Sequence, residues 1–130
     1  MRQGHCHRHG QMKGPCSCGL GRMHRLVEPV LLSLLGDERA HYGYELLERA
    51  NHEALTDSEI DAAVIYRTLR TLEEAGCVTS DWQKGEGGPQ RRMYQITEVG
   101  HDHLKDWLTV LERHAGRLQA FVHKSVPGGE

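Results

Sequence analysis

The chain has 130 residues, enough for one domain of ordinary size and too few for two independent cores or a large α/β enzyme scaffold. Apolar residues and glycine occupy 60 of the 130 positions, which excludes disorder of the whole chain, and the 15 Leu outnumber the 11 Val and Ile, which favours helices over sheets. No apolar run reaches the roughly 18 residues of a membrane span, and the first residues lack the apolar stretch of a secretory signal. We therefore expect a cytoplasmic, mostly helical protein with no membrane partner.

Residues 1–22 differ in composition from the rest of the chain. They contain three of the four Cys, three His and five of the 15 Gly, but few large aliphatic side chains. Residues 1–27 carry five basic side chains and no acidic one, whereas the other 103 residues carry 11 basic and 18 acidic side chains, a net charge of −7. A segment with so little apolar surface to bury cannot offset the entropy of ordering. We therefore expect residues 1–22 to form a flexible, basic, Cys/His-rich tail.

This tail also holds the residue types that bind soft metal ions. Thiolates and imidazoles together are ligands for soft transition metals, of which zinc fits best. The spacing departs from a zinc finger, because a Cys-x-Cys pair replaces Cys-x-x-Cys and the His residues alternate. Two interpretations stay open, a metal-binding segment and a basic tail without metal, and the fold itself is expected to need no cofactor. The candidate ligands are His5, Cys6, His7, His9, Cys16, Cys18 and His24.

Three short helices are predicted next, from apolar residues that recur every three or four positions. The first spans residues 26–35 and ends near Gly36, and the second spans residues 41–50. The third starts after Asp61, which stands where an N-cap belongs, and stops at Gly76. The expected buried faces are Tyr44, Leu46, Leu47 and Ala50 on the second helix, and Ile65, Leu69 and Leu72 on the third.

A β-hairpin and a long last helix follow. Residues 77–82 and 91–96 alternate with period two around the Gly-rich stretch 85–89, which predicts two strands joined by a long loop. Thr97 resembles the cap of a helix over residues 98–124 that carries a heptad seam, and a seam of this width needs a partner surface. We therefore predict a C-terminal dimerisation helix. Its seam consists of Leu104, Leu108, Leu111, Ala115, Leu118 and Val122, with Trp107 and Phe121 beside it.

This order of elements, mostly α with a small β-hairpin, is typical of a winged helix-turn-helix. The DNA-binding domain would span residues 23–97, and a disordered tail would follow the last helix over residues 125–130. Arginine side chains can bind phosphates or pair with guanine edges. In the competing interpretation the arginines of the third helix are solvated surface residues, with Glu74 as a partner one turn on. The candidate DNA-binding residues are Ala63, Tyr66, Arg67 and Arg70 on the third helix and Lys84, Arg91 and Arg92 on the hairpin.

Several ordered motifs resemble one known family. They are EPVLLSLL at 28–35, YGYEL at 42–46, IYRTL at 65–69, LEEAG at 72–76, Gly87-Gly88-Pro89 with Arg91, and YQITE at 94–98 with Gly100. Together they are similar to the PadR family of transcriptional regulators, over residues 28 to about 123. The resemblance implies a dimer held by the first and last helices, with the third helix in the major groove and the hairpin as the wing. It also implies DNA contacts by Tyr42, Tyr44, Tyr66, Arg67, Arg70 and Arg91.

The resemblance extends the expected dimer interface to the first helix, and it has one departure. The family usually has Ser-Pro-Gly-Thr before the tyrosine of the third helix, where this chain has Asp61-Ala62-Ala63-Val64. Asp61 places a negative charge near the phosphates, so affinity must come from a local basic patch. The expected interface residues are Leu31, Leu104, Trp107, Leu108, Leu111, Leu118 and Val122.

These features favour a homodimeric, sequence-specific DNA-binding regulator. We expect a repressor that binds a near-palindromic operator and responds to a small effector, a metal ion or redox state. The alternative is a metal-handling protein or metalloenzyme that uses the N-terminal Cys and His residues. Residues 28–123 contain no evident nucleophile-base set, phosphate loop or paired carboxylates, so we expect no enzyme activity.

The remaining conspicuous side chains have structural interpretations. Cys77 stands where a strand entry needs a small apolar residue, so we place it in the core. His101, His103 and His114 are expected to be exposed, the first two being further candidate metal ligands. The large aromatic residues Trp82, Trp107 and Phe121 are expected in the core or the dimer interface, where they could line a pocket between protomers.

Overall fold

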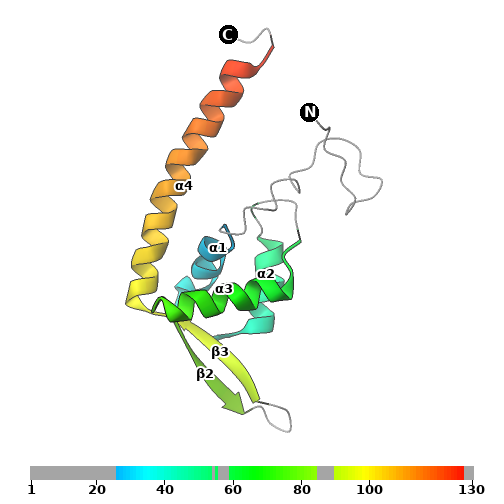
Figure 1. The fold of residues 1–130 in the computed structure, drawn as a ribbon, viewed down its shortest axis with the longest axis vertical. Helices are drawn as coiled ribbons and strands as arrows, with labels where there is room; N and C mark the ends of the chain where they lie inside the picture. The colour runs from blue at the N-terminus through cyan, green and yellow to red at the C-terminus, as the bar shows by residue number, and fades with distance from the viewer. Residues whose placement is uncertain (1–25, 54, 56–58, 85–89, 128–130) are drawn as a thin grey trace, which may run out of the picture.

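The computed structural model describes residues 26–53, 55, 59–84 and 90–127. Four helices and a three-stranded antiparallel sheet follow one another in the order expected for a winged helix-turn-helix (Figure 1). None of the helices in the described ranges is long and apolar enough to cross a membrane. The elements are α1 (Val27–Leu34), the 3-10 turn η3 (Leu35–Asp37), β1 (His41–Tyr42), α2 (Gly43–His52), α3 (Ala62–Glu74), β2 (Val78–Lys84), β3 (Gln90–Ile96) and α4 (Glu98–Ser125).

The core lies where α1, α2 and α3 pack together above the base of the sheet. The apolar stripes predicted for the first and third helices are buried, which confirms the helical periodicity. Cys77 is also buried, as predicted, and burial raises the pKa of its thiol. The largest fully buried side chains are Leu31, Leu32, Leu35, Leu46, Ile65, Leu69, Leu72 and Val78.

The start of the predicted second helix is instead a strand. His41 and Tyr42 are extended and pair with Tyr94 and Met93 of β3, so the hairpin becomes a sheet in the order β1-β3-β2. The Tyr42 backbone N–H donates to the Glu45 carboxylate at 2.8 Å, and α2 begins directly after Tyr42. Because α2 begins at Gly43, Tyr44 lies in its first turn, and its side chain is 48% exposed. The prediction of Tyr44 as a core residue is therefore wrong.

The first turn of α4 is held against the entry to β2. Thr97 is the N-cap, as predicted, and its hydroxyl accepts from the Gly100 N–H at 3.1 Å. Gly100 lies so close to the Cys77 carbonyl oxygen that an added Cβ would overlap it. The direction in which α4 leaves the domain is therefore set by contacts at its own base.

Beyond this base, α4 leans on α1 for its first turns and then extends away from the rest of the domain (Figure 1). The Glu28 carboxylate on α1 accepts hydrogen bonds from His103 Nε2 at 2.9 Å and Trp107 Nε1 at 3.2 Å. His101 also has a carboxylate partner, Glu38, at 3.4 Å. His101 and His103 are therefore partly buried pairing residues, not the exposed positions expected from the helical pattern.

One expected interface residue is excluded by this packing. Leu31 points from α1 into the core of its own protomer and has no exposed surface. Because a contact with a second chain needs accessible surface, Leu31 cannot belong to a dimer interface in this conformation. The helical periodicity places Leu31 on an apolar face, but it does not show whether the core of the same protomer or a second chain covers that face.

Candidate nucleic-acid interface

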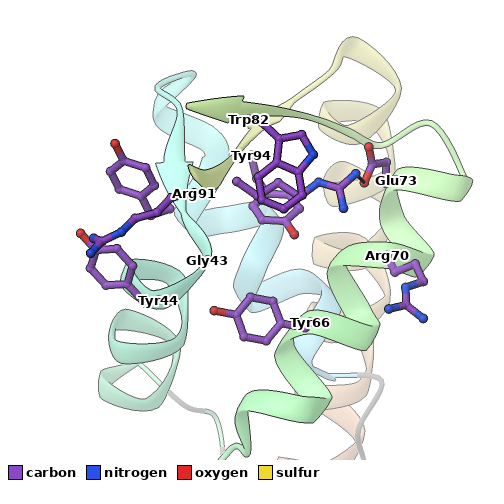
Figure 2. A pocket seen from close by; sticks show the side chains of 10 residues that line it. Gly43, Tyr44, Tyr66, Arg70, Glu73, Trp82, Arg91 and Tyr94 are labelled. Atoms are coloured by element: carbon purple, nitrogen blue, oxygen red, sulfur yellow. Dashed lines mark ion pairs between the residues drawn. The ribbon is translucent and has the colours of Figure 1, made fainter. Parts of the chain in front are cut away.

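An open cleft of about 670 Å³ lies between the start of α2, the exposed face of α3 and the sheet (Figure 2). Most of its lining side chains are aromatic or cationic, which are the types that stack on bases and bind phosphates. Among the described residues that line it, a single one is acidic. The lining residues are Tyr42, Gly43, Tyr44, Tyr66, Arg70, Glu73, Trp82, Arg91, Arg92 and Tyr94.

The α3 wall of the cleft is the outer face of an amphipathic helix. Because the buried stripe anchors α3 in the core, the opposite side faces solvent. Ala63, Tyr66, Arg67 and Arg70 all lie on this exposed side, as predicted. Small residues at the start of the helix leave room for a duplex backbone to approach.

Tyr66 is held close to the first residue of α2. A Cβ added to Gly43 would lie 2.5 Å from Tyr66 Cε1, so only glycine leaves room for the ring at this distance. Gly43 thus allows the N-terminus of α2 and the phenol of α3 to form one continuous wall. This pairing could not be predicted from the sequence, because the two residues lie on different elements.

A second group of aromatic and cationic side chains lies across the cleft, around Tyr44 and Arg91 (Figure 2). The rings of Tyr42 and Tyr44 stack with centroids 5.5 Å apart and planes 12° apart. The Arg91 guanidinium lies 5.2 Å from the Tyr44 ring centroid, within the range of a cation–π contact. Stacking on the ring orients the guanidinium and leaves its N–H groups free to bind an anion.

Arg92 is held quite differently from its neighbour, because successive residues of a strand point to opposite faces. Its guanidinium lies 5.3 Å from the Trp82 ring centroid, and its Nε donates to Ser80 Oγ at 2.9 Å. Ser80 Oγ in turn donates to the Glu73 carboxylate at 2.7 Å, and Arg92 Nη2 lies 3.8 Å from the same carboxylate. The sequence pattern predicted Arg92 as a DNA-binding residue of the hairpin, and the structure pairs its guanidinium with Glu73 of the same protomer.

Tyr94 lies deep in the cleft beside this group. Its ring is buried in the core, and burial is the main cause of the raised pKa of its phenol. The phenol therefore stays protonated at neutral pH and can act as a hydrogen-bond donor. Trp82, in contrast, is 59% exposed, so it is not the core residue that its size suggested.

The positive charge in and near the cleft comes from arginines: Arg70 and Arg91 line the cleft, and Arg67 lies on the exposed face of α3. Neither Arg67 nor Arg70 has an ion-pair partner within the described ranges, so the expected alternative pairing with Glu74 is not formed there. Arg91 is likewise without a carboxylate partner in the part of the chain that the structure describes. These three guanidinium groups are therefore available to a polyanion.

Some predicted site residues lie outside the described part of the chain. The side chain of Lys84 and all seven candidate metal ligands, His5, Cys6, His7, His9, Cys16, Cys18 and His24, belong to this group. Within the described ranges, no three His, Cys, Asp or Glu residues are grouped so that they could hold a metal ion. The predicted metal ligands His101 and His103 instead pair singly with separate carboxylates.

Comparison with known proteins agrees with this arrangement. Residues 31–106 match the model of the transcriptional regulator PadR-like family. The chain belongs to the PadR-like family. Its members are transcriptional regulators, so a DNA partner follows from the family, as the motifs had implied.

Individual proteins are similar to this chain in fold or in sequence. A PadR family transcriptional regulator from Eggerthella lenta is 27% identical, with a TM-score of 0.63 over 79% of this chain and 90% of that chain. A PadR-like regulator from Bacillus cereus, 19% identical, shares the fold with a TM-score of 0.66 over 79% and 97% of the two chains. The ferric uptake regulation protein of Brucella abortus is 30% identical over 100 residues, or 73% of this chain and 67% of its own.

Proposed function

We propose that this PadR-like protein is a homodimeric repressor that binds a specific, near-palindromic operator with α3 in the major groove and the β2–β3 hairpin along the backbone. The observation that carries this proposal is the aromatic and cationic cleft between α3 and the hairpin, in which Arg70 and Arg91 lack an acidic partner among the described residues. Residues 28–130 carry a net charge of −7, and this negative charge repels DNA. Binding must therefore be concentrated at this cleft.

The residues of the cleft divide into two roles. Tyr66 and Arg70 project from the middle of α3, where a helix in the major groove reaches base edges, and Arg70 can pair bidentately with a guanine. Arg91 stacks on Tyr44 at the edge of the hairpin, so it is placed to contact a phosphate. Arg67 lies on the same outward face of α3 and adds a further cation.

The test is duplex binding by single variants, with a duplex that the wild-type protein selects from a random pool. Arg70→Ala and Tyr66→Ala should each weaken binding by about 1 to 3 kcal/mol, and Arg91→Ala should also reduce the slope of log affinity against log salt by about 1. Arg113→Ala is the matched control, because Arg113 is an exposed arginine on α4, on a separate element from the cleft. If all three cleft variants bind like this control, the proposed interface is wrong.

The homodimer is supported by the outer part of α4. Leu108, Leu118, Phe121 and Val122 are between 53% and 65% exposed, although they recur at the spacing of a heptad seam. A helix that exposes so much apolar surface in one stripe is stabilised by pairing with a second copy. Leu104, Trp107 and Leu111 are half-buried and continue the stripe toward α1, so they can serve both the core and the interface.

We further propose that DNA binding responds to a metal ion, with redox state and a small effector as the alternatives. The seven Cys and His residues of the N-terminal segment have the donor chemistry of a soft-metal site, for which zinc fits best. The likeness to a protein named for ferric uptake regulation favours a metal as the signal. Duplex affinity should change on titration with zinc or a chelator in the wild type and not in a Cys16→Ser, Cys18→Ser double variant. An affinity that ignores zinc, chelator and oxidant alike would exclude metal and redox control.

A further inference from the structure

The acidic residue of the DNA-facing cleft is unexpected in a surface that binds a polyanion. Glu73 stands on the last turn of α3 and is the single carboxylate among the described lining residues, which also include Arg70, Arg91 and Arg92. Its side chain is 32% exposed and that of Arg92 is 44% exposed, so both groups remain within reach of solvent and of a ligand. An ion pair with this exposure can exchange partners.

Glu73 holds Arg92 by two routes. The direct route is the 3.8 Å contact between the carboxylate and Nη2, and the indirect route runs through the Ser80 hydroxyl, which accepts from Arg92 Nε and donates to Glu73. The single hydroxyl proton of Ser80 goes to the carboxylate, so the chain of donors runs in one direction from guanidinium to carboxylate. Trp82 stacks on the guanidinium and limits its other orientations.

A carboxylate and a phosphate bind a guanidinium group in the same way, through charge-assisted N–H donation to anionic oxygens. Glu73 therefore occupies in the free protein the coordination that a phosphate would take from Arg92. When a duplex strand enters the cleft, Arg92 has two options. It can stay paired with Glu73 and make no contact with a phosphate, or it can bind a phosphate and lose its ion pair with Glu73. In both cases the carboxylate reduces the electrostatic gain of binding.

We propose that Glu73 is an internal competitor for DNA phosphate, which holds Arg92 through Ser80 and thereby limits the sequence-independent affinity of the cleft. The inference rests on the proposed DNA-binding function. A regulator needs such a limit, because non-specific sites greatly outnumber the operator and the phosphate contacts supply most of the non-specific binding.

The experiment measures binding to a mixed-sequence duplex of about 30 base pairs, long enough for two half-sites one helical turn apart. Glu73→Gln removes the charge but retains an oxygen that can accept from Ser80. It should raise affinity about two- to fivefold, the range set by a partly exposed ion pair, and steepen the salt slope by about 0.9, the value for one added phosphate contact. Glu74→Gln is the matched control, because Glu74 is the next residue on α3, is exposed and makes the same change in net charge.

The gain must also depend on Arg92. When Arg92 is already replaced in an Arg92→Gln variant, adding Glu73→Gln should raise duplex affinity no more than the Glu74→Gln control does. Ser80→Ala breaks the indirect route and keeps both charges, so it should also raise duplex affinity, by a smaller factor. This variant replaces Glu73→Gln as the test if Glu73→Gln unfolds the protein. Equal effects of Glu73→Gln and Glu74→Gln, or a gain that survives the loss of Arg92, overturn this inference while leaving the proposed function intact. A wild-type protein that binds no duplex overturns both.

Discussion

At the scale of single residues, the functional side chains are placed by their immediate neighbours in the fold. Gly43 contributes only the absence of a Cβ, yet that absence lets the Tyr66 ring lie against the start of α2. Arg91 and Arg92 are adjacent in sequence and chemically identical, but one stacks on Tyr44 and the other is held by a carboxylate. The role of an arginine in this protein therefore depends on the face of the strand from which it projects.

Gly43→Ala should weaken DNA binding more than it weakens the fold. The new methyl group would displace the Tyr66 ring, which is 41% exposed and can swing into solvent, so the loss of stability should be below about 1 kcal/mol. Duplex binding should weaken by about 1 kcal/mol or more. In a protein that already carries Tyr66→Ala, Gly43→Ala should cause no further loss of duplex affinity. Gly36→Ala is the control, because nothing lies within 4 Å of its added Cβ. A full additional loss in the Tyr66→Ala background would refute the steric coupling.

Asp37 should make stability depend on pH in the acid range. Hydrogen bonds from the Arg39 backbone N–H at 2.9 Å and then from the His41 ring at 3.0 Å hold the pKa of this carboxyl below its usual value of 3.8. Because the folded protein binds this proton less tightly than the unfolded chain, the stabilisation is complete above pH 3.8 and is lost as pH falls through the lower folded value. The free energy of unfolding of the wild type should exceed that of Asp37→Asn by a small amount at pH 6, with the difference closing toward about pH 2. A constant difference across this range would contradict the assignment.

At the scale of elements, α4 has two parts with different environments. Its first turns are fastened to the domain by Gly100 at the β2 entry and by Glu28 on α1, and its outer turns expose a continuous apolar stripe. A rigid base on a long helix means that the position of a partner helix determines the angle between the two DNA-binding domains. The elements proposed to read DNA and the element proposed to pair the protomers are thus connected through the α1–α4 contact.

Leu118→Glu should dissociate the proposed dimer without unfolding the protomer. Leu118 is 53% exposed and lies on the outer part of α4, so its own protomer loses little packing. A charge buried without a partner in the interface should raise the dimer dissociation constant by about 100-fold or more. Ala120→Glu adds the same charge at an exposed position off the seam and should leave the dimer intact. Sedimentation at micromolar concentration measures both, and a Leu118→Glu dimer as stable as the wild type would place the interface elsewhere.

At the scale of the whole molecule, the proposed dimer would carry two recognition surfaces joined by a symmetric helix pair, and such an arrangement requires a symmetric target. Duplexes that the wild type selects from a random pool should contain near-palindromic half-sites about one or two helical turns apart. The Leu118→Glu variant should protect one half-site at a time and bind the two half-sites without cooperativity. Footprinting of both proteins on the selected duplex distinguishes these outcomes, and an asymmetric site bound equally by both would contradict a dimeric mode of reading.

The sequence by itself determined the order of the four helices and the β-hairpin, the buried stripes of the first and third helices, and the outward face of α3 with Tyr66, Arg67 and Arg70. These features depend on the spacing of apolar residues within one element, and that spacing can be read from the sequence alone. The motifs also identified the family, because they combine several such local patterns in a fixed order.

Only the tertiary structure decided which of these side chains meet. A two-residue strand such as β1 has too little periodicity to be seen, and its pairing with β3 is a contact between distant segments. The same holds for Gly43 beneath Tyr66, for Leu31 facing its own core, and for Glu73 holding Arg92 through Ser80. Each of these joins residues from different elements, and such contacts are fixed by how the elements pack, which no local pattern encodes.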